Sequence, residues 1–130
     1  MTAVKIAINL PVRAREKSIK FFTSLGFGLN DQLTNDNVAC IIISDDISAM
    51  LVSEPIFETI SQRKSPDTCQ QREVIVQLMV ESRARVDELV NKALAAGGRP
   101  VNEPNDMGYL YGRSFQDIDG HMWDVFHVRQ

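Results

Sequence analysis

One acidic residue interrupts a strongly apolar stretch near the C-terminal end of this 130-residue chain. The segment 122–128 is rich in aromatic and β-branched residues, which predicts a β-strand, and Asp124 lies in it between Trp123 and Val125. Because side chains alternate along a strand, Asp124 must point away from the surface that its two neighbours cover. An acid in this position faces either open solvent or a concave site. In a concave site it could hold a ligand hydroxyl or amine, or act as a general base.

Two amide side chains are expected to share the face of Asp124. They are Asn9, in a strand predicted at residues 4–12, and Gln77, in a strand predicted at residues 73–80. Two amides and one acid supply both donors and acceptors, so Asn9, Gln77 and Asp124 are predicted to line a ligand site. The alternative is that they bond one another and hold two halves of the fold in register, because buried polar groups need partners in either case.

Aromatic and cationic side chains follow one another on the strand before Asp124. Tyr109, Tyr111 and Arg113 alternate along it, and aromatic walls with one guanidinium suit a planar or anionic organic ligand. Tyr111 and Arg113 are therefore candidate ligand-binding residues. Nearby glycines permit a β-bulge, so sequence alone leaves open which face these side chains take. Phe115 is in phase with Arg113 and favours a core position instead.

A metal cluster of His121, Asp124 and His127 is disfavoured by strand geometry. Both histidines are in phase with Trp123 and Val125, whereas Asp124 faces the other way. Catalytic zinc sites use about three protein ligands, so one carboxylate makes none. His121 is expected to leave a turn, and His127 to lie at a solvent-facing edge. The chain has no glycine-rich phosphate loop, and no serine or cysteine stands at a diagnostic spacing from a base.

Composition excludes several classes of function. The net charge is −3 and no run of basic residues occurs, which argues against nucleic-acid binding and against an anionic membrane surface. Segment 1–12 lacks the pattern of a signal peptide, and no segment reaches the length of a membrane span. The two cysteines, Cys40 and Cys69, form no CxxC pair and indicate reduced thiols in a cytoplasmic protein.

The order strand, helix, three strands occurs twice along the chain, which predicts an internal duplication. The expected elements are strands at 4–12, 27–33, 38–44 and 48–53 with a helix at 13–25, then strands at 73–80, 99–102 and on both sides of the turn 117–120 with a helix after Ser82. The fold is therefore expected to be α+β, with two βαβββ modules (4–53 and 73–128) in one domain (1–130) around a shared cleft. Segment 54–72, with a short helical turn at 56–60, is either a linker or a flap over the cleft.

Each helix is expected to cover the apolar face of the sheet in its module. Ser82 is the predicted N-cap of the second helix, and Gly97 follows its end. The strand residues predicted to be buried against the helices are Ile6, Ile8, Leu10, Val74, Val76, Leu78, Trp123 and Val125.

Several of these segments together resemble a known superfamily. They are INLPV at 8–12, a helix ending in LGF at 25–27, YGRSF at 111–115 and DxDGHxW at 117–123, followed directly by the acid Asp124. This combination resembles the vicinal oxygen chelate superfamily of glyoxalases, bleomycin-resistance proteins and extradiol dioxygenases. It is most similar to the branch called lactoylglutathione-lyase-like or glyoxalase-related. The resemblance covers essentially the whole chain. It implies two βαβββ modules, a ligand cavity lined by the concave sheet faces, and a homodimer.

The resemblance also implies a metal site in the metal-dependent members, where four side chains, usually His, Glu or Gln, hold a divalent ion. The corresponding positions here are Ala7, Leu51, Ile75 and Asp124, of which only Asp124 can ligate a metal. The chain departs from the pattern again at Ile118, where proline is usual, and at Asp124, where glutamate is commoner.

The expected function is that of a glyoxalase-related protein that binds a small organic molecule without the four-ligand metal and without a cofactor. One alternative is a divergent lyase, isomerase or dioxygenase of glyoxalase type with one divalent metal ion. Another is a protein whose dimer surface or flap serves a macromolecular partner. No nucleic acid and no membrane is expected as a partner.

Overall fold

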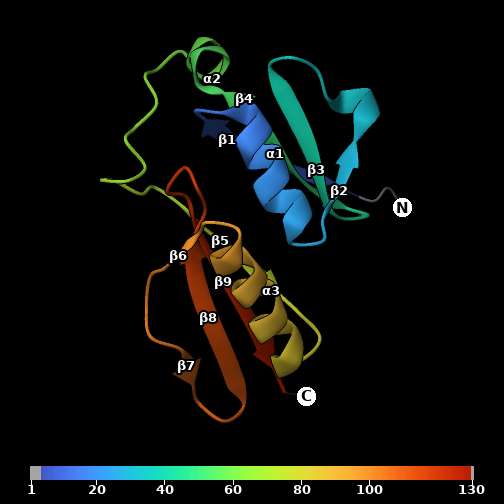
Figure 1. Ribbon diagram of the computed structural model, residues 1–130, viewed down its shortest axis with the longest axis vertical. Coiled ribbons are helices and arrows are strands. Elements are labelled where there is room, and N and C mark those ends of the chain that lie inside the picture. Colours follow the sequence, from blue (N-terminus) through green and yellow to red (C-terminus); the bar gives the residue numbers. More distant parts are fainter. Residues whose placement is uncertain (1–3, 130) are drawn as a thin grey trace. The chain divides into compact units, whose positions relative to one another are not determined.

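Two sheets organise residues 4–129, which the computed structural model describes. The chain divides into a first unit that ends at Pro66 and a second unit that begins at Asp67, with one sheet in each (Figure 1). The first sheet has the order β1 (Ile6–Val12), β4 (Ile47–Ser53), β3 (Val38–Ser44), β2 (Gly28–Asn30). The second has the order β5 (Ile75–Met79), β9 (Met122–Val128), β8 (Leu110–Gln116), β6 (Arg99–Pro100), and β7 (Asn105–Asp106) also pairs with β8.

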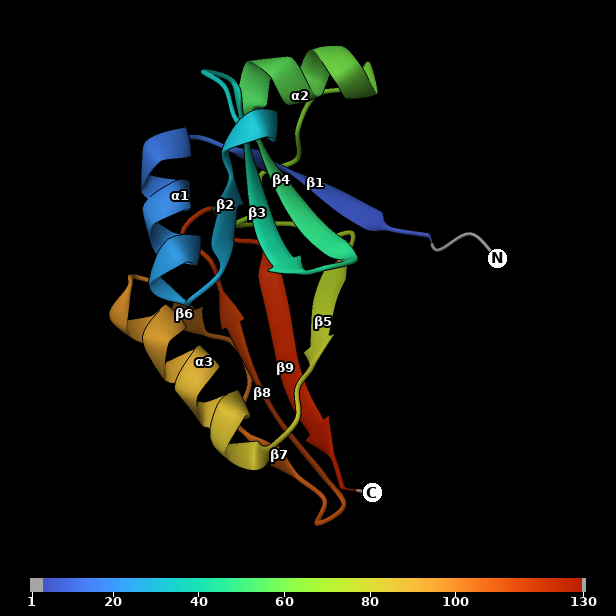
Figure 2. The same cartoon turned by 90° about the vertical axis from the view of Figure 1, so that its right-hand side faces the viewer.

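Both sheets are built by the same rule. In each, the first strand lies parallel to the last strand, which is antiparallel to the strand before it. The equivalent helix of each unit packs against its sheet: α1 (Arg15–Ser24) against β2, β3 and β4, and α3 (Arg83–Ala95) against β6, β8 and β9 (Figure 2). The first sheet is also contacted at β1 and β4 by α2 (Glu54–Ser61). The predicted duplication and the α+β class are therefore confirmed.

Helix α1 covers most of its sheet but leaves one end of β1 outside. Its Phe21 and Phe22 are buried against the sheet together with Leu10, which was predicted to be buried. Ile8 is only half-buried. Ile6 is 57% exposed, so its predicted burial is wrong. The main contacts of α1 are with β2, β3 and β4, so the beginning of β1 lies outside the area that this helix covers.

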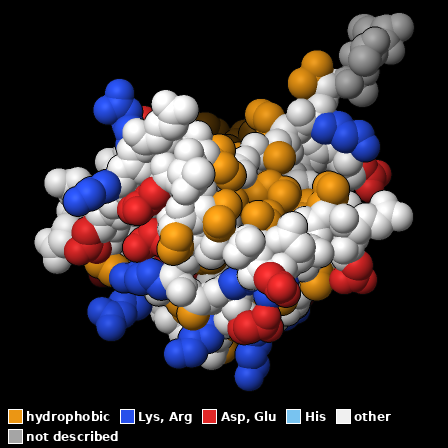
Figure 3. Space-filling model, turned by 90° about the horizontal axis from the view of Figure 1, so that it is seen from above, with side chains coloured by type: hydrophobic (Ala, Val, Ile, Leu, Met, Phe, Trp, Pro, Cys, Tyr) orange, Lys and Arg blue, Asp and Glu red, His pale blue; other side chains and the backbone are white. Residues whose placement is uncertain are grey.

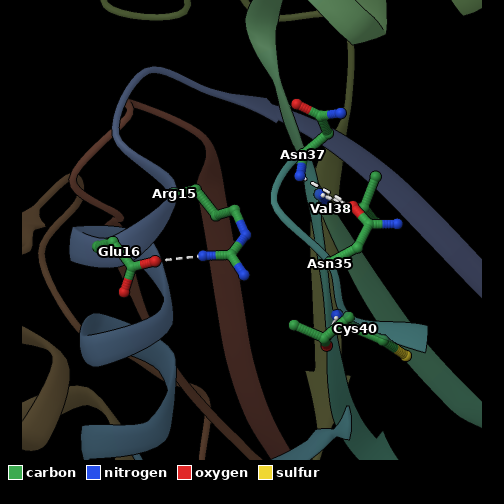
Figure 4. A network of polar contacts seen from close by, with 7 residues as sticks. Arg15, Glu16, Asn35, Asn37, Val38 and Cys40 are labelled. Carbon is green, nitrogen blue, oxygen red and sulfur yellow. Dashed lines mark hydrogen bonds and ion pairs between the residues drawn. The ribbon is translucent and has the colours of Figure 1, made fainter. Parts of the chain in front are cut away.

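The connection between β2 and β3 departs from the predicted strand at 27–33. A 3₁₀ turn at Asp31–Leu33 ends the strand early. After it, the side chain of Asn35 accepts hydrogen bonds from the backbone N–H groups of Asn37 (2.8 Å) and Val38 (3.0 Å), as Figure 4 shows. An asparagine that satisfies two backbone donors fixes the tight turn that starts β3.

Helix α3 begins and packs as its sequence predicts. Ser82 is the N-cap, and its hydroxyl accepts a hydrogen bond from the backbone N–H of Arg85 at 3.0 Å. Trp123 and Val125 are buried as predicted, and the Trp123 ring stacks parallel to that of Phe115 at 6.3 Å between centroids. The other buried apolar residues of this core are Val76, Val86, Leu89, Val90 and Ala93, whereas Leu78 is half-buried. Val74 is 56% exposed, contrary to prediction, because it precedes β5.

Segment 54–72 is not a simple connection. It contains helix α2 (Glu54–Ser61), which confirms the predicted helical turn, and the boundary between the two units falls inside it. Its C-terminal part is tied to the second unit, since Arg72 Nη1 donates to the carbonyl oxygen of Gly120 at 2.9 Å. Gly120 has φ 91°, and a Cβ there would come within 2.7 Å of the carbonyl oxygen of Thr68. Only glycine therefore permits this close approach.

Apolar side chains are not confined to the two cores. On the face shown in Figure 3, hydrophobic side chains gather in the middle, and most charged side chains lie around them. Across residues 4–129, the large hydrophobic side chains with the highest exposure are those of Val4 (85%), Ile60 (68%) and Met79 (67%). No helix within the described part of the chain is both long and apolar enough to cross a membrane.

Candidate functional site

A row of three polar side chains crosses the second sheet. The strand registers pair Gln77 of β5 with Asp124 of β9, and Asp124 with Ser114 of β8. Gln77 Nε2 donates a hydrogen bond to Asp124 Oδ2 at 2.9 Å. Ser114 Oγ accepts a hydrogen bond from the backbone N–H of Asn102 at 3.2 Å. This polar row lies on the face opposite α3, because Trp123 and Val125, on either side of Asp124, are buried in the core.

Two apolar rows flank the polar row. Ile75 pairs with Met122 on one side, and Phe126 pairs with Met79 and Gly112 on the other. Except for Met79, the residues of these rows form the floor of a pocket of about 490 Å³. The wall is completed by Leu110 and by residues of the segment after β6: Asn102, Glu103 and Asn105. The volume lies within the range of small-molecule sites.

Gly112 keeps the floor of this pocket open. A Cβ at this position would lie 3.3 Å from Phe126 Cβ, 3.5 Å from the carbonyl oxygen of Val125 and 3.9 Å from Asp124 Oδ1. Any other residue would therefore crowd Phe126 and place a side chain beside the carboxyl group of Asp124.

Tyr111 and Arg113 lie on the other face of the sheet, against α3. Tyr111 pairs with His127 and Arg113 with Val125, so their side chains point to the helix side. The Tyr111 hydroxyl donates to Asp87 Oδ1 at 2.6 Å, and Arg113 Nη1 lies 2.9 Å from the same oxygen. The face that the sequence left open is therefore the helix side for both hydroxyl and guanidinium, and the ligand-binding role expected for Tyr111 and Arg113 stays a prediction. The register between β8 and β9 is continuous, and the bulge that could have turned them is absent from Leu110–Gln116.

The charges on the helix side are matched in pairs. The Tyr111 hydroxyl and then Arg113 hold the pKa of Asp87 below its usual range, and the same hydrogen bond raises the pKa of Tyr111. Arg83 contacts Asp106 through two bonds of 3.2 and 2.5 Å. This contact, helped by the backbone N–H of Gly108, lowers the pKa of Asp106 to about 2. The guanidinium of Arg83 also lies 4.3 Å from the centroid of the Tyr111 ring.

The turn between β8 and β9 is fixed by a buried carboxyl group. Asp117 accepts hydrogen bonds from the backbone N–H groups of Asp119 (2.9 Å) and His121 (3.0 Å), and from Trp123 Nε1 (3.0 Å). Its burial raises the pKa of this group, against the lowering effect of His121. The turn was predicted, but the indole bond was not. An acid six residues before the tryptophan is the signal that could have indicated it.

Both histidines face away from Asp124, as strand alternation predicted. His121 is buried at the end of the turn. His127 is half-buried, and its Nδ1 lies 2.9 Å from the carbonyl oxygen of Val80. A carbonyl oxygen can only accept, so Nδ1 carries the proton in this contact.

The four positions implied for a metal do not carry a metal-binding set. Ala7 and Ile75 have no donor atom, and Leu51 is buried in the core of the first unit. The register corrects the assignment of Leu51: Met50 pairs with Asn9 as Asp124 pairs with Gln77, so Met50 holds the equivalent position. No group of three or more His, Cys, Asp or Glu suited to a metal occurs among residues 4–129. The side chains present therefore do not fit the four-ligand site.

Asn9 belongs to the first unit. It is exposed on β1, where it pairs with Met50, which in turn pairs with Cys40 of β3. Its predicted proximity to Asp124 in a shared cleft stays a prediction.

Comparison with known proteins gives a consistent result. The structure of hypothetical protein SA1046 from S. aureus is similar with a TM-score of 0.82 and 31% identity, over 98% of this chain and 95% of that one. A glyoxalase/bleomycin resistance protein/dioxygenase family enzyme from Burkholderia phytofirmans PsJN is similar with a TM-score of 0.81 and 16% identity, over 97% and 99% of the two chains. A glyoxalase-related enzyme from Fulvimarina pelagi gives 0.80 and 16%, over 98% and 88%. None of the curated proteins compared matches this chain.

The resemblance seen in the sequence is supported by both kinds of observation. The fold matches that of these structures over nearly the whole chain. A family model matches residues 6–125, which is nearly the whole chain. The chain belongs to the Glyoxalase/Bleomycin resistance protein/Dioxygenase superfamily.

Proposed function

We propose that this protein binds a small organic molecule in the pocket on the open face of its second sheet. Asp124, Gln77 and Ser114 supply the polar contacts, and no metal held by four side chains takes part. One observation carries the proposal: a polar row with one carboxyl group lies between two apolar rows at the floor of a pocket of about 490 Å³. The lining combines apolar side chains with amide, hydroxyl and carboxyl groups that can fix the orientation of a ligand, and the volume lies in the range of small-molecule sites.

The first unit supports a ligand-binding role for this row. At the positions equivalent to Asp124 and Ser114 it has Met50 and Cys40. The same strand order therefore forms without an acid or a hydroxyl at these positions. Since the fold does not require a carboxyl group there, its presence in the second unit is better explained by binding.

The two oxygens of the Asp124 carboxyl group are placed for hydrogen bonding to an organic ligand. Its Oδ2 already accepts a hydrogen bond from Gln77, whereas Oδ1 lies towards the space left by Gly112. A ligand donor can approach from that space. The same oxygen could accept a proton from a bound substrate, so general-base catalysis is compatible with the arrangement.

The test is an NMR screen in which small aromatic fragments, charged and uncharged, are added to isotope-labelled protein and the chemical shifts of the protein are followed. We expect shift changes centred on Gln77, Ser114, Met122, Asp124 and Phe126. Fragments that bind only elsewhere, or not at all, contradict the proposal. Elemental analysis tests its second part: a stoichiometric divalent metal that is lost in an Asp124→Ala protein favours the lyase, isomerase or dioxygenase alternative.

We also infer that the protein is a cytoplasmic homodimer. Self-association is supported by the apolar side chains exposed on edge strand β5, among them Ile75 (52%) and Met79 (67%). The cytoplasm is supported by Cys40 and Cys69, which form no disulfide with each other. Sedimentation of the wild-type protein and of an Ile75→Ser, Met79→Ser variant tests the dimer. A monomeric wild-type protein contradicts it.

A further inference from the structure

We propose that the ligand of this pocket carries a positively charged amine or amidine group on an apolar body. The inference rests on the proposed function and adds the chemical class of the ligand to it.

The charges of the pocket wall are the first argument. Among the lining residues supplied by the second unit, Asp124 and Glu103 are acidic. Arg113 also belongs to the lining, but its guanidinium extends to the other face of the sheet, where it contacts Asp87. The lining residues of this unit therefore carry two carboxyl groups, while the one guanidinium among them is held at Asp87. A carboxylate or phosphate ligand would bring a like charge towards both acids, which is unfavourable.

The hydrogen-bonding capacity of the polar row is the second argument. A carboxylate can only accept hydrogen bonds. Gln77 donates one N–H to Asp124 Oδ2, and its side-chain carbonyl oxygen is a further acceptor. Ser114 Oγ accepts from Asn102, so its own hydrogen can be donated. Acceptors therefore outnumber donors, and the row fits a ligand head that donates several hydrogen bonds. An ammonium or amidinium group does so, and its bonds to a carboxylate are strengthened by charge.

The partner of Asp124 indicates why a cationic ligand is favoured over a neutral hydrogen-bond donor. Its partner Gln77 is an uncharged amide, so this hydrogen bond does not neutralise the carboxylate. Elsewhere in the same unit, Asp87 and Asp106 each have an arginine partner. Asp124 is half-buried, and a ligand cation would supply the counter-charge that arginine supplies at the other two positions.

The two apolar rows determine which body, beyond its charged group, the ligand should have. Phe126 is half-buried beside the polar row, and aromatic ring faces attract cations. Met122, on the other side, has an adaptable thioether side chain that packs against flat rings. A ring-sized apolar body between them places a charged head over Asp124.

Three probes with similar bodies separate charge from shape: benzamidine, benzyl alcohol and benzoate, titrated at low salt and pH 7 and followed by NMR. We expect benzamidine to bind at least about tenfold more tightly than benzyl alcohol, with shifts at Gln77, Asp124 and Phe126, and benzoate to bind most weakly. The preference should shrink in Asp124→Asn, which keeps the shape of the side chain. It should persist in Glu81→Gln, which changes the net charge equally at an exposed position outside the pocket.

The outcomes separate this inference from the proposed function. If the three probes bind equally well in this pocket, or benzoate binds best, the charge preference is refuted while small-molecule binding stands. If Asp124→Asn and Glu81→Gln reduce benzamidine binding alike, the preference comes from overall charge and the assignment to Asp124 is wrong. If no probe perturbs the pocket, both proposals fail.

Discussion

The two units of this protein share a strand order and differ in what they place on it. Across the open face of the second sheet stand Gln77, Asp124 and Ser114, whereas the equivalent row of the first sheet is Asn9, Met50 and Cys40. On the helix side, Arg113 reaches Asp87 in the second unit, whereas the equivalent residue of the first unit is the buried Ala39. The scaffold thus accepts uncharged residues at all of these central positions, and apolar side chains or a thiol at the positions of Asp124, Ser114 and Arg113. Features found only in the second unit are additions to the fold, and each can be removed separately.

The largest difference in stability is expected at the turns. Asp117 in the second unit is buried and satisfies three donors, whereas Asp45 in the corresponding turn of the first unit is exposed. Asp117→Ala leaves the Trp123 indole N–H and two backbone N–H groups without their acceptor, at a cost of about 3 kcal/mol in the free energy of unfolding. Asp45→Ala should change it by less than about 0.5 kcal/mol. Urea denaturation measures both, and similar costs at the two turns contradict the comparison.

The second expected effect concerns the contact of Tyr111 with Asp87 on the helix side. Tyr111→Phe removes one hydrogen bond to a carboxylate whose side chain is 46% exposed, so we expect a loss of about 1 kcal/mol at pH 7. Tyr109→Phe is the control, since Tyr109 is 52% exposed and the structure shows no bond from its hydroxyl.

The same contact predicts a dependence on pH. The pKa of Asp87 is lowered in the folded state, so the stability it contributes is present above its unfolded pKa, near 4, and is lost as the pH falls. The pKa of Tyr111 is raised, so its contribution is present below its unfolded pKa, near 10, and is lost as the pH rises. The stability gap between wild type and Tyr111→Phe should therefore be constant from about pH 5 to 9 and close on both sides. A gap that is the same at every pH contradicts this assignment.

Strand alternation predicted the faces wherever the strand phase was certain. It placed Asp124 opposite Trp123 correctly, because the two residues are neighbours in one strand. It left the face of Arg113 open, because a single bulge would have reversed that face and only the register shows that β8 has none. The same sensitivity to one residue explains why Leu51 was assigned where Met50 lies.

Ser114 could have been found in the sequence and was missed. Residues at equal distances from the centre of a hairpin pair with each other, and Ser114 and Asp124 each lie five residues from Asp119. The wall residues Asn102 and Glu103 offered no such signal, because the strand before them, β6, has only two residues and no clear alternation. Their place depends on how the connection between β6 and β8 packs, which periodicity does not specify.

The third expected effect separates binding from stability. The first unit has Val38 at the position equivalent to Gly112, so the scaffold accepts a side chain there. Gly112→Ala places a methyl group 3.3 Å from Phe126 Cβ and 3.9 Å from Asp124 Oδ1. We expect fragment binding to weaken about tenfold, while the free energy of unfolding changes by less than about 1 kcal/mol. The control is Gly28→Ala, where the added Cβ makes an ordinary contact of 3.7 Å with Ile42. Unchanged binding in Gly112→Ala moves the ligand away from this part of the floor.

The smallest effect on stability is expected when Asp124 of the second unit is replaced by methionine, the residue that the first unit has at the equivalent position. The same substitution should be the most informative about function. Asp124→Met replaces a half-buried carboxyl group by the side chain that the scaffold already carries at Met50. The variant loses the hydrogen bond from Gln77, but it no longer holds a charge in a partly apolar pocket, and the two effects oppose each other. We expect the free energy of unfolding to stay within about 1 kcal/mol of wild type. Binding of benzamidine should nevertheless be lost, since its counter-charge is gone. Asp124→Asn completes the comparison because it keeps the polar row without the charge. If Asp124→Met unfolds the second unit, then Asp124 supports the fold, and the difference between Met50 and Asp124 no longer argues for a ligand.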